Sequence, residues 1–319
     1  MKIVTLDGYA ANPGDLSWAE IEKYGELVVY DRTEKGELDE RIKDADIVLT
    51  NKTPLSRRAI FAAEKLKFIS VLATGYNIVD IEAAKERGIA VSNVPAYSTN
   101  SVAQLAMAMV LETASLVGEH NKAVQAGAWA RSKDFCFWNA PLTELCGKTI
   151  GIFGCGSIGR ATAKIADAFG MKVLAYSRSA KPGAADGYIN FVSKEELFAS
   201  SNYISLHCPL NDESRYVVNS QSIAKMKDGA VVINTARGAC VNSLDMRAAL
   251  ESGKIAWYCA DVLEHEPMLP GDPLLGAPHC ILTPHIAWAT NEARVRLMEI
   301  TTKNIAAFLA GSPINVVNK

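Results

Sequence analysis

Residues 146–159 read Cys146-Gly-Lys-Thr-Ile-Gly-Ile-Phe-Gly-Cys-Gly-Ser-Ile-Gly159. The run at 149–153 is apolar and mostly β-forming, which is typical of a buried parallel strand. The pattern G-x-G-x-x-G follows at Gly154, Gly156 and Gly159, and residues 157–169 then carry apolar side chains at helical spacing. A strand, a glycine-rich turn and a helix in this order predict a dinucleotide site; the alternative is a purely structural turn.

Each glycine of this turn has a separate expected role. Gly154 permits the tight turn, Gly156 lets the backbone approach a pyrophosphate, and Gly159 lets the helix pack closely on the strand. The helix that begins with Ser157 and Ile158 presents free N–H groups and a positive dipole end, which attract phosphate. We therefore expect the turn and the start of the helix to contact the cofactor.

The composition describes a globular chain with little net charge. Its 319 residues suggest about two domains of ~150 residues each. The net charge of −2 and the lack of a long basic run argue against nucleic acid as a partner. No apolar stretch approaches the ~18 residues of a membrane span, and the apolar run at the start breaks too early for a signal peptide. We therefore expect a cytoplasmic protein that does not bind a membrane.

The number and spacing of the cysteines also favour the cytoplasm. The seven cysteines are scattered, odd in number and without C-x-x-C spacing. This pattern argues against a disulfide framework and favours a reducing cytosol. We expect the cysteines to be small core residues and expect no metal site.

The first part of the chain predicts an α/β domain. Short apolar strands at 2–6, 27–30, 46–50, 68–73 and 90–93 alternate with helices at 18–24, 37–43, 56–63 and 81–87. Strict alternation predicts a parallel sheet with helices on both faces. The first turn, Asp7-Gly8-Tyr9, lacks a glycine fingerprint, so this domain shows no nucleotide site of its own.

A long helix and an aromatic segment follow. Ser98 or Thr99 can cap a helix that we expect to run through Leu116. This helix is apolar nearly all round, so it should be buried, either by this chain's second domain or by another subunit. Residues 127–145 are irregular and rich in aromatic side chains. A loop of this length usually has a function or forms an interface.

The remainder continues the unit that the glycine turn begins. Strands are expected at 172–176, 203–206, 230–234, 255–260 and 280–283, with helices at 194–199, 220–225 and 244–251. A closing helix is expected at 291–309, ended by Gly311 and Pro313. Together these elements predict a doubly wound second domain.

The residues after the second strand of this domain bear on the choice of cofactor. A site for NAD usually places an acidic residue there, which holds the ribose 2′-hydroxyl. The chain has Ser177-Arg178-Ser179, followed by Lys181, and no acid. Arg178 can pair with a 2′-phosphate through its planar guanidinium group. We predict that NADP(H) is preferred over NAD(H); the alternative is that Arg178 is a solvated surface residue.

Three segments at the ends of predicted strands carry reactive groups, namely Arg237, the acidic run that includes Asp261, Glu264 and Glu266, and His285. Ligands of open α/β sheets bind outside the carboxyl ends of the strands, so these groups are expected to converge. A guanidinium group can hold a carboxylate and polarise a carbonyl. A histidine can protonate the developing alkoxide, and a carboxylate on its other ring nitrogen would fix its tautomer. Each of these residues, considered alone, is also compatible with a purely structural role.

The ordered set of motifs resembles the D-2-hydroxyacid dehydrogenase family. The set consists of the glycine turn at 154–159, Thr-Ala-Arg-Gly at 235–238, Asp-Val-x-x-x-Glu-Pro at 261–267 and Thr-Pro-His-Ile-Ala at 283–287. The resemblance covers essentially the whole chain. It implies that His285 is the acid/base, that Glu266 is its partner, and that Arg237 anchors the substrate. It further implies that Asp261 orients the nicotinamide.

The resemblance also implies the remaining site residues. Substrate contacts are expected from Lys52, Thr74, Gly75, Arg237, His285, Trp288 and Trp138. Cofactor contacts are expected from Gly154, Gly156, Ser157, Ile158, Gly159, Ser177, Arg178, Ser179, Lys181, Cys208, Pro209, Thr235, Ala236, Asp261 and Thr99. Two sequence features depart from the family pattern: Gln104 replaces a common glutamate, and Ser177-Arg178 replaces a common acid.

The family layout implies an α/β fold with two Rossmann-like or flavodoxin-like domains, the dinucleotide-binding domain being inserted into the substrate domain. We expect a discontinuous substrate domain at 1–98 and 289–319. The dinucleotide-binding domain is expected at 99–288, with the long helix and loop at 99–145 serving dimerisation. The expected assembly is a homodimer.

Within the family, the run from His285 through Trp288 resembles the glycerate dehydrogenase (hydroxypyruvate reductase) branch. We therefore predict reduction of hydroxypyruvate to D-glycerate, or of glyoxylate to glycolate. The alternatives are a reductase for another 2-keto acid such as pyruvate, and a non-catalytic dinucleotide sensor resembling the corepressors of this fold. A formate dehydrogenase is disfavoured, because those relatives carry an amide where Glu266 stands. Trp138 either reaches a neighbouring subunit's active site or packs in the dimer interface.

Overall fold

The computed structural model describes residues 1–319 and divides them into two compact units. One unit consists of Met1–Ser98 and Ala289–Lys319, and the other, Thr99–Trp288, is inserted between these two segments in the chain. Each unit contains one sheet flanked by helices, so the α/β prediction is confirmed. The roles assigned to the units, substrate binding and dinucleotide binding, remain predictions.

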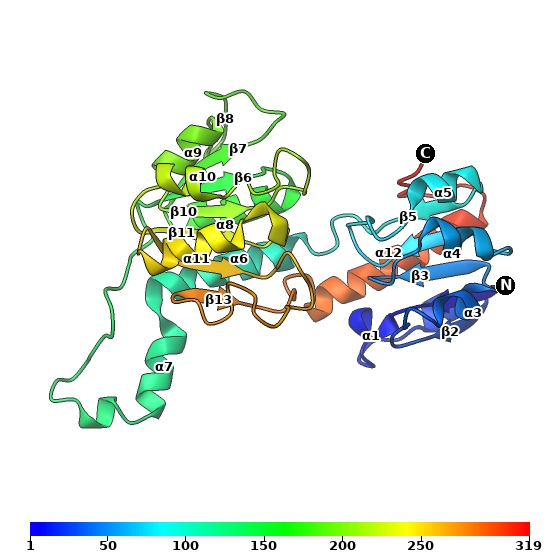
Figure 1. Ribbon diagram of the computed structural model, residues 1–319, viewed down its shortest axis with the longest axis horizontal. Coiled ribbons are helices and arrows are strands. Elements are labelled where there is room, and N and C mark those ends of the chain that lie inside the picture. The colour runs from blue at the N-terminus through cyan, green and yellow to red at the C-terminus, as the bar shows by residue number, and fades with distance from the viewer. The chain divides into compact units, whose positions relative to one another are not determined.

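The first unit is built on a fully parallel five-stranded sheet (Figure 1). The strand order β2-β1-β3-β4-β5 is that of flavodoxin-like folds. Its strands are β1 (Lys2–Thr5), β2 (Glu26–Val29), β3 (Ile47–Thr50), β4 (Phe68–Val71) and β5 (Ala90–Ser92). Its helices are α1 (Gly8–Ala11), α2 (Ala19–Glu22), α3 (Leu38–Ile42), α4 (Arg57–Ala62), α5 (Ile81–Glu86) and α12 (Asn291–Leu309).

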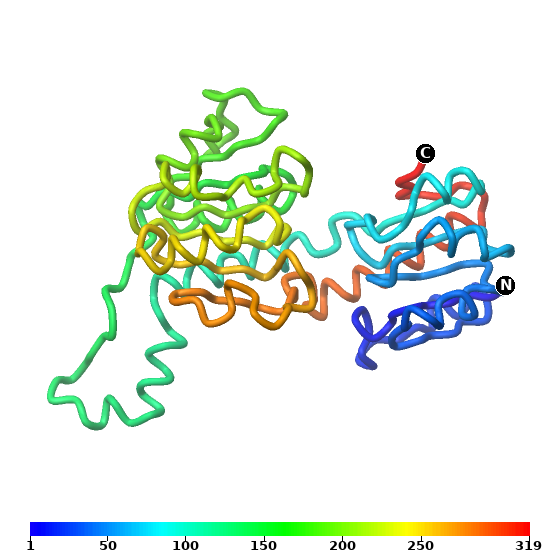
Figure 2. Tube along the Cα trace, viewed as in Figure 1, coloured from blue at the N-terminus to red at the C-terminus, as the bar shows by residue number.

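Helix α12 returns the end of the chain to this first unit, and Figure 2 shows its orange trace beside the N-terminal segments. Thr290 caps the helix by accepting a hydrogen bond from the Ala293 N–H. Phe308 stacks on Phe68 of β4 with ring centroids 4.5 Å apart. This stacking of two aromatic rings holds α12 against the sheet.

The second unit contains an eight-stranded sheet in the order β13-β12-β11-β10-β6-β7-β9-β8. All neighbouring pairs are parallel except β8 with β9. The strand order reverses direction at β6, so the crevice between β6 and β10 is the place where such sheets bind ligands. The strands are β6 (Thr149–Phe153), β7 (Lys172–Tyr176), β8 (Ala185–Asp186), β9 (Ile189–Phe191), β10 (Tyr203–Leu206), β11 (Ala230–Asn234), β12 (Ile255–Ala260) and β13 (Cys280–Leu282).

Helices cover both faces of this sheet. The sequence reading missed the edge strand β8 and its neighbour β9, which are too short to show a clear pattern. The helical segments are α6 (Thr99–Ser115), α7 (Val117–Gln125), α8 (Ser157–Ala168), α9 (Lys194–Ser200), α10 (Ser220–Lys225) and α11 (Ser243–Glu251), with short 3-10 turns at Trp129–Arg131 and Gly238–Cys240.

The long helix ends one residue earlier than expected. Leu116 adopts a left-handed conformation with φ of 52°, and a second helix, α7, begins immediately after it at an angle of 58° to α6. Helix α6 buries Met107 and Val110 against α8 within its own unit, so this chain itself covers that face. Helix α7, in contrast, has no buried residue. The sequence reading did not predict this second helix.

No single helix is long and apolar enough to cross a membrane; only α6 and α7 taken together across their bend reach that length and composition.

Candidate active site

The glycine turn after β6 is tightly confined at two of its three glycines. Gly154 has φ of 98°, and a β-carbon there would lie 2.7 Å from the Cys208 backbone nitrogen. A β-carbon on Gly159 would lie 2.3 Å from the Gly154 carbonyl oxygen. A β-carbon on Gly156, however, would meet nothing within 4 Å, and no side chain caps helix α8 at that residue. The turn therefore offers open space and a helix N-terminus, which fit a pyrophosphate.

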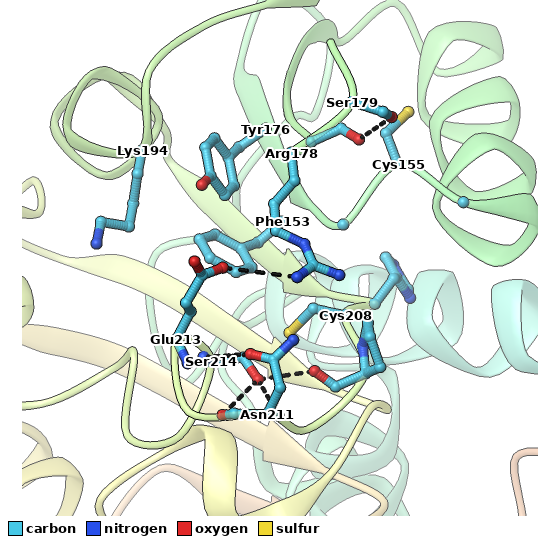
Figure 3. Close-up of a pocket in the computed structure, with 15 residues that line it drawn as sticks. Phe153, Cys155, Tyr176, Arg178, Ser179, Lys194, Cys208, Asn211, Glu213 and Ser214 are labelled. Atoms are coloured by element: carbon cyan, nitrogen blue, oxygen red, sulfur yellow. Dashed lines mark hydrogen bonds and ion pairs between the residues drawn. The ribbon is translucent and has the colours of Figure 1, made fainter. Parts of the chain in front are cut away.

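A cavity of about 520 Å³ opens beside this turn at the switch point of the sheet (Figure 3). Its size suits a ligand the size of a nucleotide. It is lined by Phe153, Gly154, Cys155, Gly156, Tyr176, Ser177, Arg178, Ser179, Lys194, His207, Cys208, Pro209, Asn211, Glu213 and Ser214. Seven of these residues are predicted cofactor contacts: Gly154, Gly156, Ser177, Arg178, Ser179, Cys208 and Pro209.

The other predicted cofactor contacts do not line this cavity. Ser157, Ile158 and Gly159 form the adjoining first turn of α8, whereas Thr99 begins α6. Thr235, Ala236 and Asp261 follow β11 and β12 along the same sheet edge. Lys181 is exposed and is absent from the lining, so the structure gives it no place at this cavity.

The charged residues at the mouth of the cavity include two that the sequence reading missed. Lys194 begins helix α9, and Glu213 lies in the loop after β10. The Glu213 carboxylate lies 3.7 Å from the Arg178 guanidinium group (Figure 3). Both side chains are largely exposed, at 64% for Arg178 and 73% for Glu213, so this ion pair contributes only ~0–1 kcal/mol. Their proximity depends on the tertiary fold, because each residue comes from a different strand end.

His207 lines the cavity as a neutral side chain. Burial lowers the pKa of His207 to about 4. The residue as a whole is only half-buried, but its Nδ1 atom is inaccessible to water and has no hydrogen-bond partner. Its Nε2 lies 2.9 Å from the Ser205 hydroxyl. His207 therefore adds no positive charge to the cavity at neutral pH.

The three reactive segments leave neighbouring strands at one edge of the sheet. Strands β11, β12 and β13 are adjacent and parallel, with Asn234 opposite Ala260 and Ala260 opposite Leu282. Because the carboxyl ends of these strands meet at the same edge, the segments after them are brought together. Motifs that are separate in the sequence therefore lie at one edge of the sheet.

Glu266 and His285 form a direct hydrogen bond. The Glu266 Oε2 atom lies 2.6 Å from His285 Nδ1. The other carboxylate oxygen of Glu266 accepts a hydrogen bond of 2.9 Å from the Leu263 N–H, which holds the carboxylate in place. Since an ionised carboxylate only accepts, Nδ1 carries the proton and Nε2 is the nitrogen that can exchange a proton with a substrate. Glu264, the other candidate acid, instead accepts a hydrogen bond from the Tyr216 hydroxyl.

Asp261 holds the loop that carries His285. Its buried carboxylate accepts hydrogen bonds from the Thr283 hydroxyl at 2.5 Å and from the Ile286 and Ala287 N–H groups at 2.8 Å each. His285, between these donors, has φ of 55°, a left-handed conformation that costs a non-glycine residue ~1–3 kcal/mol. The bonds on both sides of His285 offset that cost, so Asp261 positions the imidazole.

We expect Asp261→Asn to lower kcat about tenfold or more, because the amide keeps one acceptor oxygen but turns a donor toward the loop N–H groups. Unfolding free energy should fall by about 2 kcal/mol for the same reason. The kinetics at saturating substrate and thermal unfolding measure the two effects. Thr283→Val, which removes only one of the donors, is the matched control and should have a smaller effect on both. An unchanged kcat in Asp261→Asn would show that the loop holds His285 without this carboxylate.

Arg237 lies in a well-defined backbone segment with an exposed side chain. Asn234 accepts a hydrogen bond from the Ala236 N–H and donates one to the Arg237 carbonyl, which fixes the turn. A β-carbon on Gly238 would lie 1.9 Å from the Leu263 carbonyl carbon, so only glycine permits this turn to approach the segment before Glu266. The guanidinium group donates to the Ala236 carbonyl at 2.7 Å.

The predicted substrate residues of the first unit lie after two of its strands. Lys52 is exposed, and its N–H, together with those of Asn51 and Thr53, donates to the Asp7 carboxylate at 2.5–2.7 Å. Thr74, after β4, is exposed and donates its hydroxyl to the Val94 carbonyl, with Gly75 half-buried beside it. These contacts make both loops ordered; their role at the substrate remains a prediction.

The two predicted tryptophans have different surroundings. Trp288 is half-buried at the end of the second unit. Trp138 is 65% exposed in the segment after α7, where Phe135 is 90% exposed and Trp129 donates its indole N–H to the Phe135 carbonyl. This segment contains no regular element beyond the 3-10 turn at Trp129–Arg131, which agrees with the irregular structure expected for 127–145.

Comparison with known proteins gives consistent matches. The family model described as D-isomer specific 2-hydroxyacid dehydrogenase, NAD binding domain, matches residues 107–287. The chain is 51% identical over 322 residues to a hydroxypyruvate reductase of Blautia hydrogenotrophica, covering 100% of both chains. It is 38% identical to a glyoxylate reductase of Thermococcus litoralis, over 94% of this chain and 92% of that one. An acyclic imino acid reductase, solved in complex with NADPH and D-Arg, superposes with a TM-score of 0.87 at 29% identity, covering 99% and 100% of the two chains.

Proposed function

Since this chain belongs to the family of D-isomer-specific 2-hydroxyacid dehydrogenases and is an NAD(P)-dependent oxidoreductase, we propose that it reduces hydroxypyruvate to D-glycerate, or glyoxylate to glycolate. The observation that carries the proposal is the Glu266–His285 hydrogen bond of 2.6 Å, at the sheet edge that also carries Arg237. The similarity to a hydroxypyruvate reductase along the full chain supports the choice of substrate.

The residues of the second unit divide the chemistry between them. A bound dinucleotide would supply the hydride. Arg237 would bind the substrate carboxylate and stabilise negative charge that develops on the carbonyl oxygen. His285 would donate the proton from Nε2 to that oxygen, while Glu266 stabilises the imidazolium form through Nδ1. In the reverse direction His285 accepts the same proton.

The direct test is the loss of the absorbance of reduced nicotinamide when the purified protein meets hydroxypyruvate. Turnover with hydroxypyruvate or glyoxylate that exceeds turnover with pyruvate and bulkier 2-keto acids supports the proposal. Faster turnover with pyruvate would instead indicate a reductase for another 2-keto acid. Dinucleotide binding without turnover of any 2-keto acid would indicate a sensor.

We further propose that the enzyme prefers NADP(H) to NAD(H). The argument rests on the cavity mouth, where Arg178, Ser177 and Ser179 follow β7 with no acidic side chain among them. Lys194 adds a second cation to the same lining. Glu213 opposes the preference, but its exposed pair with Arg178 contributes only ~0–1 kcal/mol, whereas a charge-assisted bond to phosphate contributes ~1.5–3 kcal/mol.

We expect Arg178→Ala to lower kcat/KM for NADPH about tenfold to 100-fold, which corresponds to the loss of one charge-assisted hydrogen bond. The value for NADH should change little, because NADH has no 2′-phosphate. Lys164→Ala, an exposed cation on α8 that does not line the cavity, is the matched control. A wild-type protein that prefers NADH, or an equal loss with both cofactors, would contradict the preference for NADP(H).

The exposed segment from α7 to residue 145 supports the proposal of a homodimer. Its apolar side chains Val117, Trp129, Phe135, Trp138 and Leu142 are each more than half exposed. Exposed clusters of large apolar side chains typically mark protein interfaces. Sedimentation equilibrium should report twice the mass of the chain.

A cytoplasmic location stays a prediction from the free cysteines, which fit a reducing compartment.

A further inference from the structure

Two cysteines contact each other beside the cofactor cavity. The Cys208 and Cys240 sulfur atoms lie 3.8 Å apart. Cys208 follows β10 and lines the cavity (Figure 3), whereas Cys240 lies in the 3-10 turn Gly238–Cys240 after β11. Because β10 and β11 are adjacent strands, the fold brings together two residues that are 32 positions apart in the chain.

The two sulfur atoms are in contact but are not bonded. An S–S bond is about 2.05 Å long, so the sulfur atoms must approach each other by about 1.8 Å. Cys208 lies in the loop after β10 and Cys240 ends the short 3-10 turn, so neither residue belongs to a strand and the movement breaks no hydrogen bond between strands. Cys208 is half-buried at the cavity wall, and Cys240 is completely buried behind it. A small reagent can therefore reach Cys208 but not Cys240.

We propose that Cys208 and Cys240 are an oxidative modification site, at which a hydroperoxide converts the two thiols into a reversible disulfide. The Cys208 sulfur attacks the peroxide oxygen, which gives a sulfenic acid and releases the alcohol, or water if the oxidant is hydrogen peroxide. The Cys240 sulfur then displaces hydroxide from the sulfenic acid and forms the S–S bond. Two electrons pass from the sulfur atoms to the peroxide, and the two thiol protons leave in the alcohol and in water.

The rate of this reaction follows from the surroundings of Cys208. The hydrogen bond with Cys240 and burial raise the pKa of the Cys208 thiol above its usual range. The nucleophilic thiolate is therefore scarce at neutral pH, and oxidation is slow. A dinucleotide in the cavity would cover Cys208, so bound cofactor should protect the pair.

The disulfide would disturb both sides of the site. The Cys208 backbone nitrogen abuts the glycine turn, where a β-carbon on Gly154 would lie 2.7 Å from it. The Cys240 N–H donates to the Arg237 carbonyl at 3.1 Å, so movement of Cys240 pulls on Arg237. A shift of about 1 Å in such positions can lower turnover about 100-fold. Oxidation is thus expected to weaken dinucleotide binding and to lower activity together.

The test exposes the full-length protein to hydrogen peroxide, blocks the remaining thiols by alkylation and examines the peptides by mass spectrometry. We expect a linked peptide pair containing Cys208 and Cys240, lighter by two hydrogen atoms than the separate thiol peptides. NADPH affinity, measured by fluorescence, should fall at least tenfold and recover with dithiothreitol. Saturating NADPH during exposure should suppress the link. The linked mass and the NADPH affinity require no substrate, so they are independent of the proposed reaction.

Cys240→Ser is the decisive variant, because it removes the buried partner and leaves the cavity wall intact. It should form no link and retain its NADPH affinity after the same exposure, whereas Cys146→Ser, which removes an exposed cysteine, should behave like the wild type. Equal loss of affinity in Cys240→Ser would overturn the proposal. It would also be overturned if Cys208 were recovered only as a sulfinic acid, or if the link formed without loss of affinity.

Discussion

His285→Ala should lower kcat by about 10²–10⁴-fold, the range that a positioned general acid contributes. His285 is the only histidine that the structure places against a carboxylate at the edge of β11, β12 and β13. Alanine removes the Nε2 proton donor and leaves Glu266 without its partner. Since the imidazole does not line the cavity beside the glycine turn, NADPH affinity should stay near that of the wild type.

The measurement is kcat with hydroxypyruvate at saturating NADPH, beside NADPH affinity by fluorescence. His120→Ala is the matched control, because His120 lies on α7 and its ring contacts the Leu116 carbonyl and no carboxylate. Glu266→Gln should give an intermediate loss, since an amide can still accept from Nδ1 but does not stabilise the imidazolium charge. Near-wild-type turnover in His285→Ala would contradict the assignment of His285 as the acid/base.

Arg237→Ala should raise KM for the keto acid and lower kcat together, with kcat/KM falling by about 10²–10³-fold. We expect the KM effect because, in the proposed mechanism, the guanidinium group binds the substrate carboxylate before reaction. We expect the kcat effect because, in the same mechanism, its charge stabilises the oxygen that becomes negative. Arg237 is exposed at the end of a rigid turn, which Asn234 holds through hydrogen bonds to Ala236 and Arg237. The turn therefore positions the Arg237 side chain, and no acidic residue of that turn neutralises its positive charge.

Steady-state kinetics with hydroxypyruvate measure both parameters. Arg237→Lys keeps the charge but loses the planar pair of donors, so it should recover only part of the loss. Arg247→Ala, a cation on α11 that pairs with Glu251, is the control and should leave both parameters unchanged. A rise in KM with unchanged kcat would mean that Arg237 binds the substrate but does not stabilise the reacting oxygen.

The helix break at Leu116 shows one limit of reading the sequence. The sequence reading ended the long helix at Leu116 and predicted no helix after it, because Val117 and Gly118 are weak helix formers. The left-handed conformation of the buried Leu116 ends α6 and lets a second helix, α7, begin at Val117. The tertiary contacts around a helix end decide whether another helix follows it, and the local sequence does not contain those contacts.

The cavity mouth shows a second limit. Arg178 could be read from its position after a strand, but Lys194 and Glu213 could not. Lys194 follows β9, a strand too short to show a clear pattern, and Glu213 lies in a loop 35 positions after Arg178. These three side chains line the same cavity only because β10, β6, β7 and β9 are neighbours in the sheet.

The sequence alone determined the elements around the glycine turn and the chemical types of the reactive residues, because strand, turn and helix propensities and the need for glycine are local properties. Tertiary structure decided which residues meet. In the folded chain His285 forms a hydrogen bond with Glu266 rather than with Glu264. Asp261 forms hydrogen bonds with the loop that carries His285, and Cys208 contacts Cys240. Those contacts join residues far apart in the chain, and only the order of strands in the sheet sets their distances.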